Sequence, residues 1–419
     1  MRRGFRYTAV LGSLALVAAL AVPVSPAAAG HGGALTVQVG QHFGVGANCN
    51  QQTFQGCRGG ESMRFLTPNL RVHKGDTVTM DFHGFHTATL LPKNSDVFGW
   101  IQANTPGTSN PFSLFVPDPD DTPLDGGTAE KPSVKVNPAV QFPTDPTCGT
   151  TTDNPCDYTG ALLNSGVPEG EGDEPITFSA EINANAGDHV WVLCLIHPHM
   201  FFKVTVVPDS QATSTQADID AFKAAVLAGD LDWAQAQDAK LINKRSSHVT
   251  ASGQKVYDVY AGVDNHRVSL SAMYPAKTVV PKGATVRFHF DELIYEHHTV
   301  TMSFQEGLER GQEMFSPWCD PDTDSGPGPD EPPDFSAGPP CGGDFSKFEV
   351  DIPSPLWNVT GDGVFTGNDD FENSGFRGGL QYSLASHDVK FQKPSNRKGW
   401  KFFCLVHGPF MSGRVRVKG

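Results

Sequence analysis

Two short stretches of the chain each bring together side chains that can bind a metal ion. Residues 191–207 read WVLCLIHPHMFFKVTVV, and residues 401–417 read KFFCLVHGPFMSGRVRV. In each stretch a histidine follows a cysteine by three positions, and a methionine comes shortly afterwards. The residues are Cys194, His197 and Met200 in the first stretch and Cys404, His407 and Met411 in the second.

A thiolate, imidazoles and a thioether form a ligand set that suits copper in both of its common oxidation states. In a type 1, or blue, copper site the thiolate and two neutral imidazoles surround the metal in a plane, and the thioether is a weak and distant axial ligand. Structural zinc sites use closed sets of cysteine and histidine without methionine. The two stretches therefore predict copper sites, each of which needs one more histidine.

A frame that occurs twice upstream supplies this histidine. His86 opens the sequence HTATL and His298 opens HTVTM, and each follows a segment that resembles a strand. The shared H-T-x-T frame favours these two residues as ligands. Three neighbouring histidines compete for positions in the sites: His83 with the first, His297 with the second, and His199 with the axial methionine of the first stretch.

These motifs belong to an internal repeat. The two H-T-x-T frames lie 212 residues apart, the two cysteine motifs lie 210 apart, and two Asn-Ser-Gly sequences, beginning at residues 164 and 373, lie 209 apart. LRVHKGDTV at 70–78 and VVPKGATV at 279–286 precede the corresponding histidines. The chain is therefore predicted to contain one domain in two copies.

At these residues both copies resemble the cupredoxins, the family of amicyanin and plastocyanin. CLIHPHM has the C-x2-H-x2-M spacing of amicyanin, and CLVHGPFM has a C-x2-H-x3-M spacing within the range of plastocyanin-like loops. The resemblance implies a Greek-key β-sandwich or barrel, with copper near one end and the downstream histidine close to solvent. It does not account for the 106 to 108 positions between the first histidine and the cysteine of each copy.

The expected fold class is all-β, with two cupredoxin-like Greek-key domains joined by a helical connector. Alternating apolar residues, such as Val286, Phe288 and Phe290, predict strands, and the 44 glycines and 32 prolines predict many turns. Residues 30–208 and 251–419 are assigned to the two domains. Insertions rich in proline, aspartate and glycine, at 104–156 and 318–345, are expected to be loops.

Residues 209–250 between the domains have a different pattern. A capping box at Thr215 and Asp218 precedes apolar residues at helical spacing, and Gly229 is expected to end this helix. A second helical stretch is expected from Leu231 to Lys244. The segment is therefore predicted to be a helical connector.

Cysteine pairing separates structural from metal-binding cysteines. Six of the eight cysteines form local pairs in loop-like sequence, which is typical of disulfides in exported domains. The pairs are Cys49 with Cys57, Cys148 with Cys156, and Cys319 with Cys341. Cys194 and Cys404 remain, and a disulfide between them is the alternative to two metal sites. Each has the same neighbouring histidine in its copy, which favours the metal sites.

Residues 1–29 have the features of a secretory signal peptide. Arg2, Arg3 and Arg6 precede an apolar run at 9–24 and three alanines at 27–29. The paired arginines faintly resemble a twin-arginine signal. No later stretch is long and apolar enough to span a bilayer. The protein is therefore expected to be secreted or periplasmic.

The charge of the chain limits its partners. A net charge of −15 argues against nucleic acid and against anionic lipid surfaces. The sequence does not identify the redox partner proteins. The D-x-D-x-D run at 320–324 could bind calcium, but its proline and the absence of a closing glutamate favour a solvated loop.

Electron transfer by two mononuclear type 1 copper sites is the leading functional interpretation. Multicopper oxidases and copper nitrite reductases are also built from repeated cupredoxins, but their additional copper centre uses a histidine directly before the cysteine. Leu193 and Phe403 occupy these positions here, and the one His-x-His pair is that of His197 and His199. No catalytic residue is therefore assigned, and an enzyme of this kind is disfavoured. Copper storage or cell-surface binding without redox turnover is the alternative function.

Overall fold

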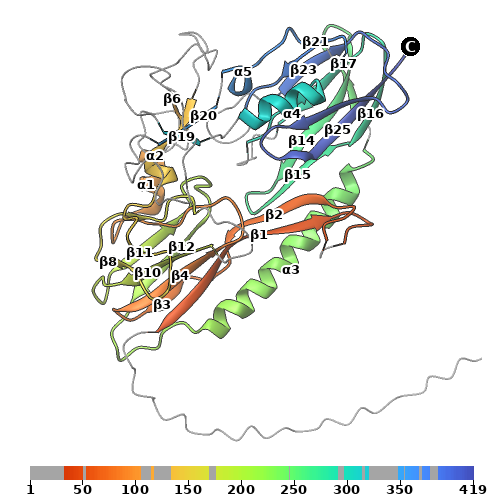
Figure 1. Cartoon of the computed structure of the whole chain (residues 1–419). Helices are drawn as coiled ribbons and strands as arrows, with labels where there is room; N and C mark the ends of the chain where they lie inside the picture. The colour runs from red at the N-terminus through yellow and green to blue at the C-terminus, as the bar shows by residue number, and fades with distance from the viewer. Residues whose placement is uncertain are drawn as a thin grey trace, which may run out of the picture. The chain divides into compact units, whose positions relative to one another are not determined.

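Strands make up most of the regular structure of the protein (Figure 1). The computed structural model describes residues 33–50, 53–104, 115–117, 134–168, 176–244, 246–290, 297–313, 317–319, 348–352, 354–367, 370–377 and 386–419. All of them belong to one compact unit, His31–Gly419. The prediction of a mainly β fold is confirmed.

In the first half of the chain two sets of strands enclose one apolar core. Their orders are β2-β1-β4-β10-β8 and β3-β12-β11-β5-β9. Buried and more exposed residues alternate along strands such as β12, so that one face of each set points inward. The strands are β1 Ala34–Val45, β2 Arg58–Phe65, β3 Leu70–Val72, β4 Asp76–Phe82, β5 Thr89–Leu90, β8 Cys156–Tyr158, β9 Leu163–Asn164, β10 Ile176–Ile182, β11 His189–Leu193 and β12 Phe201–Val206.

The second half has the same strand order, position by position. Its sets are β15-β14-β17-β23-β21, with β13 added beside β14, and β16-β25-β24-β18-β22. A second core lies between them. The strands are β13 Ser246–Val249, β14 Lys255–Asp264, β15 Val268–Tyr274, β16 Lys277–Pro281, β17 Thr285–His289, β18 Thr301–Met302, β21 Val364–Phe365, β22 Glu372–Asn373, β23 Ser386–Phe391, β24 Trp400–Cys404 and β25 Gly408–Lys418.

The two halves share one sheet, because β2 pairs with β15 in antiparallel orientation. The pairing is symmetric about one position. Glu61 pairs with Ser269, and each of these residues also pairs with the equivalent strand of its own half, Glu61 with His42 of β1 and Ser269 with Asp264 of β14. Glu61 and Ser269 are therefore equivalent residues of the two halves that meet at their junction.

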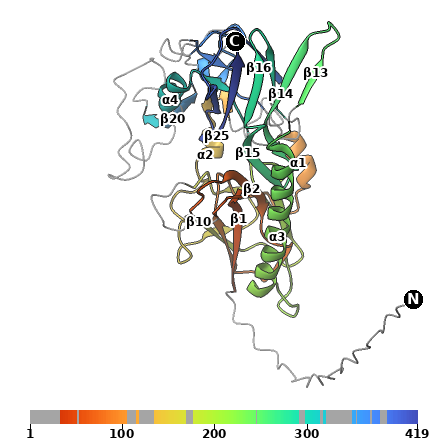
Figure 2. The same cartoon turned by 90° about the vertical axis from the view of Figure 1, so that its right-hand side faces the viewer.

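Helix α3, Gln216–Leu241, runs alongside β1, β2 and β15 (Figure 2). The predicted capping box at its start is present, since Thr215 and Asp218 bond each other reciprocally. Gly229 does not end the helix as expected: one continuous helix of 26 residues runs through it and includes the second predicted stretch as far as Leu241, three residues short of its predicted end at Lys244. Packing of its buried residues against the sheet offsets the helix propensity lost at a single glycine, which is about 1 kcal/mol.

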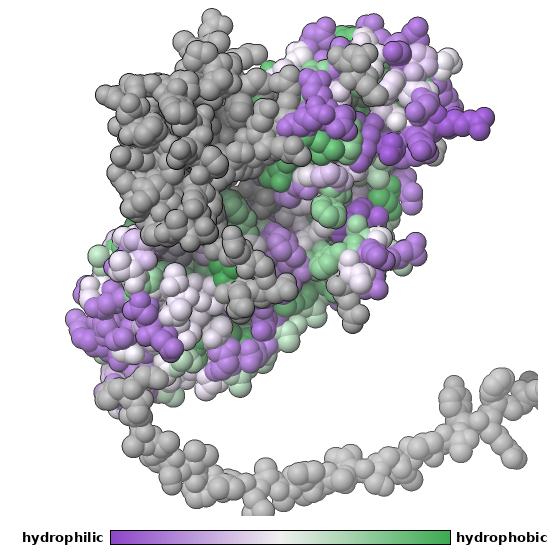
Figure 3. Space-filling model, viewed as in Figure 1, coloured by the Kyte–Doolittle hydropathy of each residue, from purple (hydrophilic) through white to green (hydrophobic). Residues whose placement is uncertain are grey.

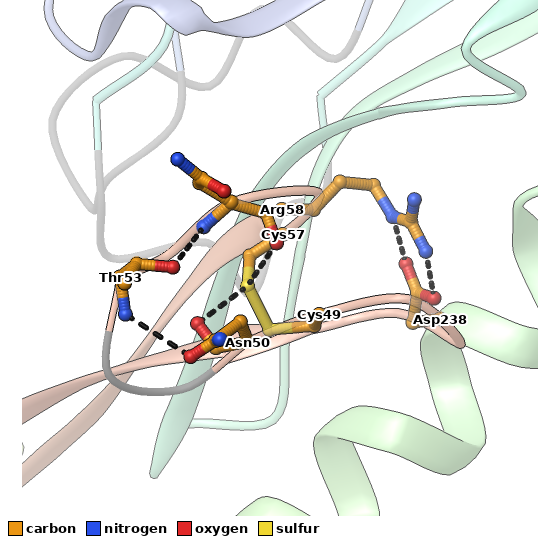
Figure 4. Close-up of a disulfide and its surroundings, with 7 residues drawn as sticks. Cys49, Asn50, Thr53, Cys57, Arg58 and Asp238 are labelled. Carbon is orange, nitrogen blue, oxygen red and sulfur yellow. Dashed lines mark hydrogen bonds and ion pairs between the residues drawn. A yellow bond between two sulfur atoms is a disulfide. The ribbon is translucent and has the colours of Figure 1, made fainter.

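Two buried aspartates attach α3 to β2. Asp238 accepts hydrogen bonds from the guanidinium of Arg58, as Figure 4 shows, and from the hydroxyl of Tyr274 on β15. Asp230 accepts a bond of 2.6 Å from Ser62 and two bonds from Arg64. The helix is therefore bonded to strands of both halves at their junction.

The first predicted insertion, 104–156, contains the strands β6 and β7 rather than only loops, and these strands form a sheet with β19, at the start of the second insertion, 318–345, and with β20, which follows that insertion. The order of this sheet is β19-β20-β7-β6, and β7 of the first half pairs with β20 of the second. The strands are β6 Phe115–Pro117, β7 Val134–Val136, β19 Pro317–Cys319 and β20 Phe348–Ile352. The described residues also form the short helices α1 Val97–Ala103, α2 Pro138–Gln141, α4 Phe304–Glu313 and α5 Ser354–Trp357.

Two of the predicted disulfides are present, between Cys49 and Cys57 (Figure 4) and between Cys148 and Cys156. Cys341 and the D-x-D-x-D run at 320–324 lie outside the described residues, and with them the third predicted pair and the calcium loop. Cys194 and Cys404 are buried and not disulfide-bonded. Among the helices of the described segments, none has the length and apolar character needed to cross a membrane.

Candidate metal centres

The first candidate site brings together three buried side chains, those of His86, Cys194 and His197. The two Nδ1 atoms lie 3.0 Å apart. The sulfur of Cys194 lies 3.9 Å from Nδ1 of His86 and 3.6 Å from Nδ1 of His197. His86 comes from the segment before β5, and the other two residues lie in the loop between β11 and β12.

The second candidate site repeats this arrangement with His298, Cys404 and His407. The two Nδ1 atoms lie 3.2 Å apart, and the sulfur lies 4.0 Å and 3.5 Å from them. In both sites these separations fit three donors that lie about 2.0–2.3 Å from a common centre. The thiol and imidazole donors therefore suit a copper ion in position as well as in chemistry.

Hydrogen bonds from the H-T-x-T frame hold each cysteine. In the first half the backbone N–H of Thr87 points to the sulfur of Cys194 at 3.4 Å, and the hydroxyl of Thr87 accepts a bond from the backbone N–H of Leu195. The second half has the same two bonds, from Thr299 to Cys404 at 3.3 Å and from Leu405 to Thr299. The first threonine of the frame thus aligns the histidine segment with the cysteine strand.

The repeated Asn-Ser-Gly sequence supports the H-T-x-T frame from its other side. Ser165 accepts a bond from the backbone N–H of Ala88, and Asn164 accepts one from the hydroxyl of Thr89. Asn164 also donates to backbone carbonyl groups beside α2. The equivalent serine and asparagine contacts recur in the second half, with Ser374 and Asn373.

A glycine with a positive φ angle makes room for each upstream histidine. Gly40 has a φ of 72°, and a Cβ atom there would lie 2.4 Å from Nε2 of His86. Gly262 has a φ of 79°, and a Cβ atom there would lie 2.3 Å from Nε2 of His298. Any larger side chain would displace the imidazole ring, so that the backbone itself forms one wall of each site.

The two predicted axial methionines are buried in the cores that also contain the cysteines. In the first site the backbone N–H of Cys194 donates to the carbonyl of Met200, and that of Met200 donates to the carbonyl of His197. In the second site Cys404 instead pairs with Gly408 at the start of β25. The loops thus close differently, as their lengths require, while Met200 and Met411 are both enclosed.

The surroundings favour the ionised form of both cysteines. Burial raises the pKa of each thiol, but the adjacent imidazoles lower it further, and the pKa values of Cys194 and Cys404 lie well below the ordinary value. Burial lowers the pKa of His86, but Glu61 and Cys194 together raise it to about 9. A thiolate is the form of cysteine that binds metal ions.

Glu61 is a part of the first site that the sequence motifs did not reveal. Its Oε1 lies 2.7 Å from Nε2 of His86, on the side of the ring away from Cys194. Glu61 stands on β2, 25 positions before the histidine, and belongs to no repeated motif. A histidine ligand commonly donates its second N–H to a carboxylate. An acidic residue on a neighbouring strand is therefore the sequence signal that could have indicated Glu61.

The competing histidines lie outside the two groups. His83 is 40% exposed and bonds Asp81 at 3.0 Å. His297 packs against Phe376. His199 is half-buried beside His197, with ring centroids 6.2 Å apart.

The two downstream histidines differ in their exposure. His197 is buried, and Phe201 after it packs against Trp191 and Phe98. His407 is half-buried, and Phe410 beside it is 87% exposed. Figure 3 shows hydrophilic residues in separate regions of the visible face, with hydrophobic residues between them, and exposed large apolar side chains are few among the described residues.

The residues that flank the two cysteines meet in one apolar cluster. Leu193 and Leu195 of the first half pack in the same cluster as Phe403 and Leu405 of the second. Apolar side chains therefore connect the surroundings of the two sites.

Comparisons with known proteins give cupredoxin-like structures. No protein-family model and no curated protein matches the chain. It is similar to oxidised plastocyanin from Dryopteris crassirhizoma, with 19% identity over 38% of this chain and 99% of that chain and a TM-score of 0.17. It is also similar to the blue copper oxidase from Nitrosomonas europaea, with 10% identity over 92% and 86% of the two chains and a TM-score of 0.17.

A third similar structure is the copper-containing nitrite reductase from Thermus scotoductus SA-01, with 10% identity over 92% of this chain and 68% of that chain and a TM-score of 0.18.

Proposed function

We propose that the protein binds two copper ions in mononuclear type 1 sites and acts in electron transfer. The observation that carries this proposal is the presence of two equivalent groups of one buried cysteine and two histidines with converging donor atoms. The proposed ligands of the first site are His86, Cys194, His197 and Met200. Those of the second site are His298, Cys404, His407 and Met411.

The surrounding chain suits a metal that changes its oxidation state without changing its ligands. Copper supplies a one-electron couple, Cu(II) and Cu(I), and the same soft and nitrogen donors serve both states. The N–H groups of Thr87 and Thr299 stabilise the thiolates, and the Asn-Ser-Gly contacts hold the histidine segments in place. Preorganised donors of this kind need little movement when an electron is gained or lost.

The positions next to the cysteines support a carrier rather than an enzyme. Leu193 and Phe403 are buried apolar residues of the cluster shared by both halves, where a further copper centre would require histidine. Within the described part of the chain, the two proposed sites are the groups of three or more histidine, cysteine or acidic side chains with the spacing of metal ligands.

We also propose that the protein works outside the cytoplasm. The two disulfides support an oxidising compartment, and residues 1–29 have the sequence features of a signal peptide. The mass of the protein isolated from its native host tests this, because cleavage would remove about 29 residues. A full-length protein recovered from the cytoplasm would contradict it.

Copper counting and visible absorption test the proposed function. The wild-type protein should bind two copper ions per chain and show an intense visible band that bleaches with ascorbate and returns on oxidation. Cys194→Ser should remove one copper ion and leave the band of the second site, and Cys404→Ser should do the reverse. A protein that binds only Cu(I) and stays colourless would indicate storage, and loss of both ions from either variant would indicate a single shared site.

A further inference from the structure

Glu61 lies on the strand where the two halves of the chain meet. Alternate residues of β2 point to opposite sides of the sheet. Arg58, Ser62 and Arg64 point to one side and bond the aspartates of α3. Met63 and Phe65 belong to the core of the first half, on the side from which Glu61 reaches His86.

The contact between Glu61 and His86 determines which nitrogen of the ring carries a proton. The side chain of His86 is fully buried and that of Glu61 is 13% exposed. An ionised carboxylate can only accept a hydrogen bond, so Nε2 of His86 must donate. The lone pair of a neutral ring is then on Nδ1, which faces Cys194 and His197.

The chain leaves space for this carboxylate at two glycines. A Cβ atom at Gly84 would lie 2.1 Å from Oε1 of Glu61, and a Cβ atom at Gly40 would lie 3.1 Å from it. Both would also crowd Nε2 of His86, at 2.9 Å and 2.4 Å. The contact between Glu61 and His86 therefore requires glycine at both positions.

The second site has no carboxylate at the equivalent position. Ser269, which pairs with Glu61 across the junction and is its counterpart in the second half, is 1% exposed. Within the described part of the chain, its hydroxyl has no hydrogen-bond partner. At this position a negative charge in the first half is thus replaced by a neutral group in the second.

We propose that Glu61 is a positioning residue of the first site, which orients His86 through Nε2 and lowers the reduction potential of that site. This rests on the proposed copper function. A negative charge one ring away from the metal stabilises Cu(II) more than Cu(I), and its effect is strong because the contact is buried. The couple involves one electron, which the added reductant supplies in a redox titration.

Glu61→Gln tests the charge, because an amide oxygen can still accept the bond from Nε2. Full-length Cys404→Ser protein, which retains the first site, is titrated by visible absorption with and without Glu61→Gln. We expect the ratio of the Cu(II) and Cu(I) binding constants to fall about tenfold, which is a rise of about 59 mV for a one-electron couple. Glu61→Ala, which removes the acceptor as well, should also weaken copper binding at this site.

The matched control is Glu61→Gln in Cys194→Ser protein, which retains the second site. Its potential should change far less, since Ser269 rather than Glu61 stands at the equivalent position. An unchanged potential at the first site, or equal changes at both, would overturn the role of Glu61. Loss of copper from the first site alone, restored by Glu61→Asp, would support the positioning role. Failure of both parent proteins to form a copper band would instead refute the proposed function.

Discussion

At the scale of single residues, Met200 is the proposed ligand whose removal should change the first site least severely. It is buried, and backbone bonds place its loop against Cys194 and His197. Met200→Leu in the Cys404→Ser protein should retain copper and raise the reduction potential, because a weak axial donor is replaced by an apolar group. The measurement is a redox titration followed by visible absorption.

The same change at Met411 in the Cys194→Ser protein is the matched control. A rise at both sites would assign the axial role to both methionines. If Met200→Leu leaves both copper binding and potential unchanged, His199 or another group is the axial ligand of the first site.

His387 should make the stability of the protein depend on pH. Burial and the charge of Arg377 lower the pKa of His387 from 6.5 to about 4. Below pH 6.5 the unfolded chain binds a proton that the folded chain excludes, so stability is full above pH 6.5 and falls towards pH 4. The loss should reach about 3 kcal/mol.

The measurement is the free energy of unfolding of the metal-free protein in urea at pH 7 and pH 4.5. His387→Gln should show a smaller loss over this interval. His189→Gln, at a strand position that is less buried, serves as the control. Equal pH dependence in the wild type and the His387 variant would contradict the prediction.

The sequence predicted the repeated parts of the sites because local motifs encode them. Cysteine, histidine and methionine lie within one loop, and the H-T-x-T frame marks the segment that bonds to it. The assignment of these residues as copper ligands remains a prediction. Glu61 could not be predicted, because its contact with His86 depends on the position of β2 in the folded sheet and no local sequence pattern encodes that position.

At the scale of elements, α3 should stabilise the junction of the two halves. Asp238 is buried and accepts bonds from Arg58 and Tyr274. Asp238→Ala would leave the guanidinium and a buried hydroxyl without this partner, and it should lower the free energy of unfolding by about 3 kcal/mol. Urea unfolding followed by circular dichroism measures this.

Asp232→Ala is the matched control, since Asp232 is exposed on the same helix. It should change stability by less than about 0.5 kcal/mol. Equal effects of the two substitutions would show that the buried contacts do not stabilise the junction.

Elements with a local sequence signal were predicted, and elements that depend on contacts distant in the sequence were not. The start of α3 was predicted because a capping box is a local signal, whereas its continuation through Gly229 depends on packing against the sheet. The sheet of β6, β7, β19 and β20 could not be predicted, since β7 and β20 pair over more than 200 positions of sequence. Such pairing has no signal in composition.

At the scale of the whole molecule, charge is distributed unevenly in a chain of net charge −15. Lys277, Arg414 and Lys401 lie in one row across β16, β25 and β24, and the described residues provide no ion pair for any of them. Phe410 lies four positions before Arg414 on β25, next to the second site. This positive surface should favour an anionic electron donor.

Phe410→Asp tests whether electrons reach the second site by this surface. In the Cys194→Ser protein, reduction by hexacyanoferrate(II) should slow several-fold, because a negative charge is added on the path of an anion. Reduction by the cation hexaammineruthenium(II) should not slow, and the visible band should persist. Stopped-flow absorption measures both rates.

Val249→Asp is the matched control, since Val249 is 67% exposed on β13. It should leave both rates nearly unchanged. If the two variants slow hexacyanoferrate(II) equally, the effect reflects overall charge and Phe410 does not lie on the path.

The pairing of β2 with β15 also matters while the chain is being made. The ribosome synthesises β2 roughly 200 residues before β15. The edge of β2 that pairs with β15 in the folded protein is therefore unpaired during this part of synthesis. An unpaired edge can join the strands of other chains, and charged side chains oppose this. Arg58 and Arg64 place two positive charges on β2 before α3 has been synthesised. We therefore expect the arginines that bond the helix in the folded protein to oppose aggregation of the incomplete chain as well.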